Sequence, residues 1–148
     1  MYCSPNEVRN GALFEHSIGF DRNVKVFCKN TSAFQICHTY LKGGEERAER
    51  VVRINQKSWQ LLWENKEEID RCISKMKKKE PVCFQMQLSE DVVLRVKSGS
   101  YCIDLRKYQR SPWEAADHAS EEGVSLKFAE WSALMRLSSV LNRLLLGM

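Results

Sequence analysis

Basic and aromatic side chains are interspersed in the first half of the chain, and this combination has the chemistry needed to hold single-stranded nucleic acid. Ammonium and guanidinium groups pair with phosphates, and flat rings stack on unpaired bases. The basic residues that we select are Lys25, Lys29, Arg50 and Arg53, and the aromatic residues near them are Phe27, Phe34 and Tyr40. For Phe27 and Phe34, a place on the core face of a sheet is the stronger expectation.

Residues 101–108 hold a second group of this kind. Side chains two positions apart on a strand face the same side, so Arg106 and Tyr108 should share a face, with Asp104 beside them. Tyr108 then belongs either to this face or to the core, and the sequence leaves both alternatives open.

The groupings that catalysis or metal binding would need are missing from the sequence. His16, His38 and His118 are too scattered to pair with a nucleophile, and there is neither a glycine-rich phosphate loop nor an H-E-x-x-H helix. Cys28, Cys37 and His38 match the spacing of no usual zinc module. We therefore expect no enzymatic activity, no cofactor and no bound metal.

The net charge of +4 comes entirely from the first part of the chain. Residues 1–80 contain 15 Lys+Arg and 11 Asp+Glu, whereas residues 81–148 contain 8 of each. This balance suits a nucleic-acid partner, and a mildly basic surface accounts for it equally well. The lysine run in residues 75–80 is expected to be a charged helix end before Pro81, with a phosphate-facing patch as the weaker alternative.

Neither a membrane span nor a secretory signal is expected. No apolar run approaches the length of about 20 residues that crosses a bilayer. The first residues have neither a basic start nor an apolar stretch. The six cysteines contain no C-x-x-C pair and mostly lie among apolar residues, which favours reduced thiols. These features predict a nuclear or cytoplasmic protein without membrane association.

Hydrophobic periodicity predicts strands followed by one long helix, twice along the chain. The first part is expected to contain strands at residues 24–29, 33–41 and 50–54 and a helix from about residue 56 to about residue 76. The second is expected to contain strands at residues 82–88, 92–96, 101–108 and 124–126, a polar loop at 109–122 and a helix over 128–146. With Pro81 at the boundary, the predicted units are residues 1–80 and residues 81–148.

The two strand-to-helix junctions correspond residue by residue. Each residue of the second junction is separated from its counterpart in the first by the same difference in residue number, which we call the repeat offset. The pairs related by the repeat offset are Val52 and Val124, Ile54 and Leu126, Trp59 and Trp131, Leu62 and Leu134, Ile69 and Leu141, and Ile73 and Leu145. Apolar residues that recur in the same order at one offset indicate duplication of a structural unit. We therefore predict that the chain contains two copies of one unit.

Several motifs in the second unit point to a known family. They are Phe84-Gln85-Met86, then Val92, Leu94 and Arg95, Gly99, the segment Ile103-Asp104-Leu105-Arg106-Lys107-Tyr108, Pro112, Gly123-Val124-Ser125-Leu126 and Trp131. In combination they resemble the positive cofactor four family of transcriptional coactivators and single-stranded DNA-binding proteins. The first unit resembles this family only at the strand-to-helix junction and the helix, so it looks like a degenerate copy.

The resemblance implies an α+β fold made of two repeats of a four-stranded antiparallel sheet followed by one helix, arranged as an intramolecular pseudo-dimer. One sheet with one helix leaves an apolar helix stripe uncovered, and a second copy would cover it. The residues expected in the shared core are Trp59, Leu62, Trp131, Leu134 and Leu137. Whether two such chains form a homodimer stays open.

The resemblance also implies a site. Arg95 and Arg106 match basic DNA-contacting strand positions of the family, and Lys97 and Lys107 are secondary candidates. The family usually has a stacking aromatic residue at the position of Gln109. Trp113 is a candidate replacement for this ring, and packing onto the sheet is an equal alternative for it.

Two functions follow as expectations. The first is a nuclear, coactivator-type protein that binds the phosphate backbone of single-stranded DNA, or of RNA, with little sequence specificity. The second is a protein-interaction or dimerisation module of the transcription or replication machinery that has lost nucleic-acid binding. The absent aromatic at Gln109 and the uncharged balance of residues 81–148 motivate this second function.

Overall fold

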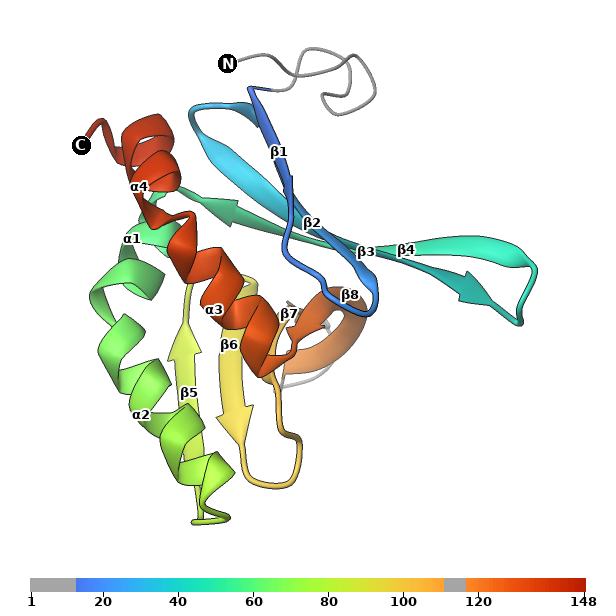
Figure 1. Ribbon diagram of the computed structural model, residues 1–148, viewed down its shortest axis with the longest axis vertical. Helices are drawn as coiled ribbons and strands as arrows, with labels where there is room; N and C mark the ends of the chain where they lie inside the picture. The colour runs from blue at the N-terminus through green and yellow to red at the C-terminus, as the bar shows by residue number, and fades with distance from the viewer. Residues whose placement is uncertain (1–12, 111–116) are drawn as a thin grey trace.

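Two four-stranded antiparallel sheets, with helices packed against them, form the frame of the protein (Figure 1). The computed structural model describes residues 13–110 and 117–148. Strand order is β1-β2-β3-β4 in the first sheet and β5-β6-β7-β8 in the second. Each strand therefore pairs with its neighbour in sequence, as short antiparallel connections favour. The predicted α+β class is confirmed.

The first sheet consists of β1 (Phe14–Ser17), β2 (Asn23–Asn30), β3 (Ala33–Lys42) and β4 (Glu46–Asn55). The strands predicted at 24–29 and 33–41 are close to β2 and β3. The prediction that the fourth strand covers only 50–54 was wrong. Gly43 and Gly44 take positive φ angles of 64° and 84°, which makes a tight hairpin, so pairing with β3 continues to residue 46.

The second sheet consists of β5 (Cys83–Gln87), β6 (Val92–Lys97), β7 (Ile103–Arg110) and β8 (Asp117–Leu126). The prediction of a loop over residues 109–122 was wrong for residues 109–110 and 117–122. Arg110 pairs with Asp117, and the ladder continues past a register shift between Arg106 and Tyr108. A polar segment can form a strand at this position because backbone hydrogen bonds, rather than apolar side chains, hold it in the sheet.

The helices are α1 (Gln56–Glu64), α2 (Lys66–Lys77), α3 (Phe128–Arg136), α4 (Ser138–Leu141) and the π-helix η1 (Asn142–Leu146). Each of the two long helices that we predicted is thus interrupted, after Glu64 and after Arg136. The interruptions at Asn65 and Leu137 are separated by the repeat offset, and so are the bounds of α1 and α3. Asn55 caps α1 as predicted, because its Oδ1 accepts a hydrogen bond from the Ser58 backbone nitrogen at 2.8 Å.

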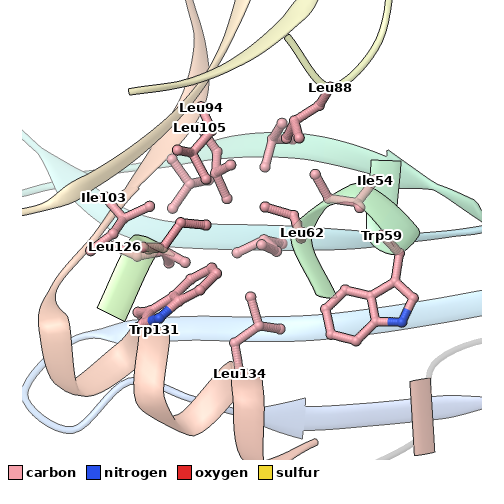
Figure 2. Close-up of a cluster of buried hydrophobic side chains, with 14 of the residues drawn as sticks. Ile54, Trp59, Leu62, Leu88, Leu94, Ile103, Leu105, Leu126, Trp131 and Leu134 are labelled. Carbon is pink, nitrogen blue, oxygen red and sulfur yellow. The ribbon is translucent and has the colours of Figure 1, made fainter. Parts of the chain in front are cut away.

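The hydrophobic core lies between the sheets and the helices (Figure 2). Trp59, Leu62, Trp131 and Leu134 are fully buried in it, as predicted, whereas Leu137 is only partly buried against it. Phe34 is also fully buried and meets Trp59 edge to face, with the ring centroids 5.7 Å apart. The preference for Phe34 as a core residue over a stacking residue is therefore confirmed.

Alternation gives each sheet an inner face toward this core and an outer face away from it. Val26, Ile36 and Val52 lie side by side on the inner face of the first sheet, and Leu94, Leu105 and Val124 do so in the second. Strand β4 of the first sheet lies against β8 of the second. In the described ranges 13–110 and 117–148, no helix is long and apolar enough to cross a membrane.

Candidate nucleic-acid interface

The outer face of the second sheet carries the arginine and tyrosine side chains that the sequence analysis singled out. Arg95 pairs across the strands with Gln85 on one side and with Asp104 on the other. The guanidinium carbon of Arg95 lies 5.6 Å from the centre of the Tyr108 ring. Its Nε donates a hydrogen bond to Oε1 of Gln85 at 3.2 Å. Tyr108 is therefore a partly exposed residue of this face, which decides between the two alternatives left open for it.

Arg106 lies on the same face and is held by Asp104. Its Nε and Nη2 donate to the two carboxylate oxygens of Asp104 at 3.1 and 2.9 Å. The Ser125 hydroxyl donates to the same carboxylate at 2.7 Å. The hydrogen bond with Asp104 raises the pKa of Arg106, so the guanidinium stays fully charged. A phosphate approaching Arg106 must therefore compete with a carboxylate already in place.

Lys97 and Lys107 lie at different places. Lys97 is exposed at the end of β6, two residues beyond Arg95, so it extends the outer face of the second sheet. Lys107 pairs with Val92 instead, and its Nζ lies 3.9 Å from a carboxylate oxygen of Asp91. It lines a cleft of about 440 Å³ between β4 and the turn that joins β5 to β6. Arg53 of the first sheet lines the same cleft, so two candidates from different sheets come together there.

The candidates of the first sheet do not share one face. Lys25 and Arg53 lie on the outer face, where Lys25 is opposite Cys37 and its Nζ lies 3.7 Å from Oε1 of Glu15. Arg50 pairs with His38 on the opposite face. Its guanidinium carbon lies 5.7 Å from the centre of the Tyr40 ring. The structure therefore separates Arg50 from the other two cations.

Lys29 contributes a cation to the end of β2, beside an aromatic ring. Its Nζ lies 5.7 Å from the centre of the Phe27 ring. Phe27 is buried, but it lies on the outer face, opposite Gln35, and is not part of the core cluster, so the prediction that it lies on the core face was wrong. Because it is buried, its ring is not accessible for stacking in this conformation. In the first sheet, the partly exposed ring of Tyr40 lies beside Arg50, on the face opposite to that of the other cations. The second sheet has two arginines and the partly exposed ring of Tyr108 on one face.

A partly buried ion pair that the sequence analysis missed joins the turn between β1 and β2 to helix α3. Arg22, in the turn between β1 and β2, donates from Nε and Nη2 to the carboxylate of Glu130 in α3, at 2.8 and 2.5 Å. Nη2 also donates to the Ser125 backbone carbonyl. Beside this pair, Lys127 and Asp21 form a second, exposed ion pair at 2.6 Å. Glu130 stands at the third position of α3, where a glutamate often accepts a hydrogen bond from the N-cap backbone nitrogen, here that of Lys127 at 2.8 Å. This position explains part of the role of Glu130 but does not reveal Arg22 as its partner.

The pKa values of Glu130 and His38, which lie near this ion pair, follow from burial and charge. Burial on its own would raise the pKa of Glu130, but the hydrogen bonds from Arg22 and from the Lys127 backbone nitrogen outweigh it and lower the pKa. Burial lowers the pKa of His38, and the positive charge of Arg22 adds to this effect. The carboxylate of Glu130 is thus charged, and the imidazole of His38 is kept neutral at physiological pH.

Trp113, the predicted replacement for the stacking ring, lies outside the described residues, and so does Pro112. Across residues 13–110 and 117–148, no three His, Cys, Asp or Glu side chains are grouped so that they could hold a metal ion. Comparisons with models of protein families, with curated proteins and with solved structures return no match for this chain. A functional assignment therefore depends on the geometry of the site and on the resemblance seen in its motifs.

Proposed function

We propose that this protein binds single-stranded nucleic acid on the outer face of its second sheet, as a coactivator-type protein of the nucleus. The observation that carries this proposal is the cluster of Arg95, Arg106 and Tyr108 on the outer face of one sheet, with Lys97 at its end. Cations beside a partly exposed ring are the combination that single strands require, because phosphates and unpaired bases alternate along them.

The chemistry of this face favours the phosphate backbone over base sequence. Guanidinium and ammonium groups contact phosphates, which are the same in every nucleotide, and a ring stacks on any base. Binding should therefore tolerate many sequences and weaken steeply as salt is added, since counterions are released on binding. We propose DNA as the ligand from the family resemblance, and RNA has the same phosphate and base chemistry.

We propose further that the chain is an internal pseudo-dimer of two units. Two hydrogen bonds support this idea. The indole nitrogen of Trp59 donates to Oδ1 of Asn142 at 2.8 Å, and that of Trp131 donates to Oδ1 of Asp70 at 3.0 Å. The repeat offset separates Trp59 from Trp131, and it also separates Asp70 from Asn142. Reciprocal contacts of this kind are the signature of a two-fold interface. In this arrangement each unit contributes one interrupted helical segment.

The direct test is fluorescence anisotropy of a labelled oligo-dT of about 20 nucleotides at two salt concentrations, with duplex as competitor. We expect the affinity for oligo-dT to fall as salt is added. We also expect duplex DNA to be a poor competitor. Arg95→Ala should weaken it and reduce its salt dependence. Arg136→Ala, which removes an exposed arginine from the end of α3, is the matched control. Absence of binding by the unaltered protein at low salt would overturn the proposal.

One contact favours a second function, an interaction module that keeps the fold without binding nucleic acid. Asp104 already neutralises Arg106 through two hydrogen bonds, which lowers the attraction of this face for phosphate. In that case the face would recognise a protein of the transcription or replication machinery. A partner that is recovered from extract after nuclease treatment, together with no oligo-dT binding, would favour this function.

A further inference from the structure

Lysines and one tyrosine gather at the end of the second sheet, where α2 terminates beside the turn between β6 and β7. We call this group the lysine tip and define it as Lys75, Lys78, Lys79, Lys97 and Tyr101. A small cleft of about 180 Å³ lies within it, lined by Met76, Lys79, Glu80, Ser98, Gly99 and Tyr101. The four lysines are exposed, and Glu80 is the acidic residue that lines this cleft.

Two members of the lysine tip have unusual backbone conformations. Among the residues that the structure describes, Lys79 and Tyr101 are the non-glycine residues with positive φ, at 61° and 50°. Such a conformation is unfavourable for any side chain with a Cβ atom, and it tends to mark functional positions. Both residues line the same cleft.

The end of α2 explains the conformation of Lys79. The backbone nitrogen of Glu80 donates to the Lys75 carbonyl at 2.9 Å, and that of Lys79 donates to the Met76 carbonyl at 3.0 Å. This is the Schellman pattern that ends many helices, and the position of Lys79 in it is usually occupied by glycine. A lysine there brings its ammonium group to the cleft at a cost in backbone free energy that glycine would avoid.

The turn beyond β6 places Tyr101 across the cleft. Both the backbone nitrogen and the hydroxyl of Ser98 donate to the Val82 carbonyl at 2.9 Å, which ties this turn to the segment after α2. Tyr101 follows in sequence and is 52% exposed, although Ile103 and Leu105 further along are fully buried. An aromatic side chain is therefore presented to solvent at a cleft that Lys79 also lines.

The lysine tip continues the proposed binding face. Arg95 and Lys97 are two residues apart on β6 and point to the same side, about 7 Å apart along the strand. Cations therefore follow one another from Arg106 and Arg95 to Lys97, and then to the end of α2. Figure 1 shows the end of α2 and the turn between β6 and β7 at the same end of the molecule.

We propose that the lysine tip is a second contact region for single-stranded nucleic acid, in which the lysines bind phosphates and Tyr101 stacks on a base. This inference rests on the proposed function and extends it. It assigns a role to the C-terminal end of α2, which belongs to the first part of the chain. The rest of the site comes from the second part of the chain. An exposed aromatic next to the cations favours nucleic acid over an acidic peptide, because the ring needs a flat partner.

Glycine substitutions test this proposal without damaging the fold. Tyr101→Gly and Lys79→Gly remove the ring and the charge while favouring the positive φ, so both variants should unfold at an unchanged or higher urea concentration. With oligo-dT, Tyr101→Gly should weaken binding roughly 5- to 100-fold with little change in salt dependence. Lys75→Gln combined with Lys78→Gln and Lys79→Gly should lower the slope of log K against log salt by about 2.

Arg136→Gln combined with Arg143→Gln is the control, because both arginines are exposed in the last turns of other helices. Oligo-dT binding by the unaltered protein, with lysine-tip variants that behave like this control, would overturn the inference and leave the proposed function in place. No binding by the unaltered protein would overturn both. Lysine-tip variants that keep oligo-dT affinity but lose affinity for a polyglutamate peptide would overturn the inference in favour of an acidic protein partner.

Discussion

The indole nitrogen of Trp59 donates a hydrogen bond to Asn142 at 2.8 Å, across 83 residues of chain. Trp131, which the repeat offset relates to Trp59, donates to Asp70 at 3.0 Å. The two bonds have the same pattern but different surroundings. Trp59 and Asn142 are both buried, whereas Asp70 is exposed. The two bonds should therefore contribute unequally to stability.

Asn142→Ala should destabilise the protein more than Asp70→Ala does. The first change leaves the Trp59 N–H buried without an acceptor, which costs about 1–3 kcal/mol of unfolding free energy. At Asp70, water can replace the lost carboxylate, so we expect a cost of roughly 1 kcal/mol or less. Urea unfolding followed by tryptophan fluorescence measures both values. Equal losses would mean that the two bonds contribute alike despite their different burial.

Glu130→Gln should reduce stability at neutral pH by roughly 3 kcal/mol, the lower part of the range for breaking a buried ion pair, since Arg22 keeps 23% of its side chain exposed. Glutamine can still accept the hydrogen bond that the Lys127 backbone nitrogen donates to this side chain at 2.8 Å. The effect of the substitution therefore isolates the charge of Glu130.

The same substitution should flatten the pH dependence of stability. The pKa of Glu130 is lower in the folded protein than its ordinary value of 4.5. On acidification, the unfolded chain therefore takes up the proton first. The stabilisation is complete above that ordinary pKa and is lost as pH falls through the folded value. Urea unfolding at neutral pH and at a series of pH values below the ordinary pKa of glutamate should show the two proteins converging in acid. A constant difference between them would contradict this.

Asp104→Asn should strengthen binding of oligo-dT. It removes the carboxylate charge that competes with a phosphate for the Arg106 guanidinium. One further phosphate contact should steepen the slope of log K against log salt by about 0.7 for a single strand. Anisotropy titrations at several salt concentrations give this slope. If affinity and slope stay the same, Arg106 contacts no phosphate and is not part of the binding face.

Gly123→Ala should destabilise the second sheet by about 2–3 kcal/mol. Gly123 has a φ of 154°, and a Cβ atom there would lie 2.6 Å from the Leu105 carbonyl oxygen and 2.7 Å from Cα of Arg106. Backbone atoms cannot move aside as a flexible side chain can. Gly99→Ala is the control, because a Cβ atom there meets nothing within 4 Å and only its φ of 90° is unfavourable. Urea unfolding compares the two.

Local sequence patterns were sufficient for most elements. The hydrophobic alternation located strands β2 to β8 at least in part, and Asn55 located the start of α1. The repeat offset also anticipated which tryptophans and leucines share the core. These features depend on periodicity and capping, which are properties of neighbouring residues. The prediction failed for the polar part of β8, which was expected to be a loop. This part is a strand because its backbone pairs with β7, and its own residues do not indicate that pairing.

The α+β class, most strands of the two sheets, and the shared face of Arg106, Asp104 and Tyr108 all follow from the pattern of residues along the chain. Two contacts could be learned only from the folded molecule: Arg53 and Lys107 meet in one cleft, and the partly exposed Arg22 pairs with the buried Glu130. Alternation fixes the side of a strand on which a side chain lies, whereas a contact between distant residues depends on how the sheets and helices pack together.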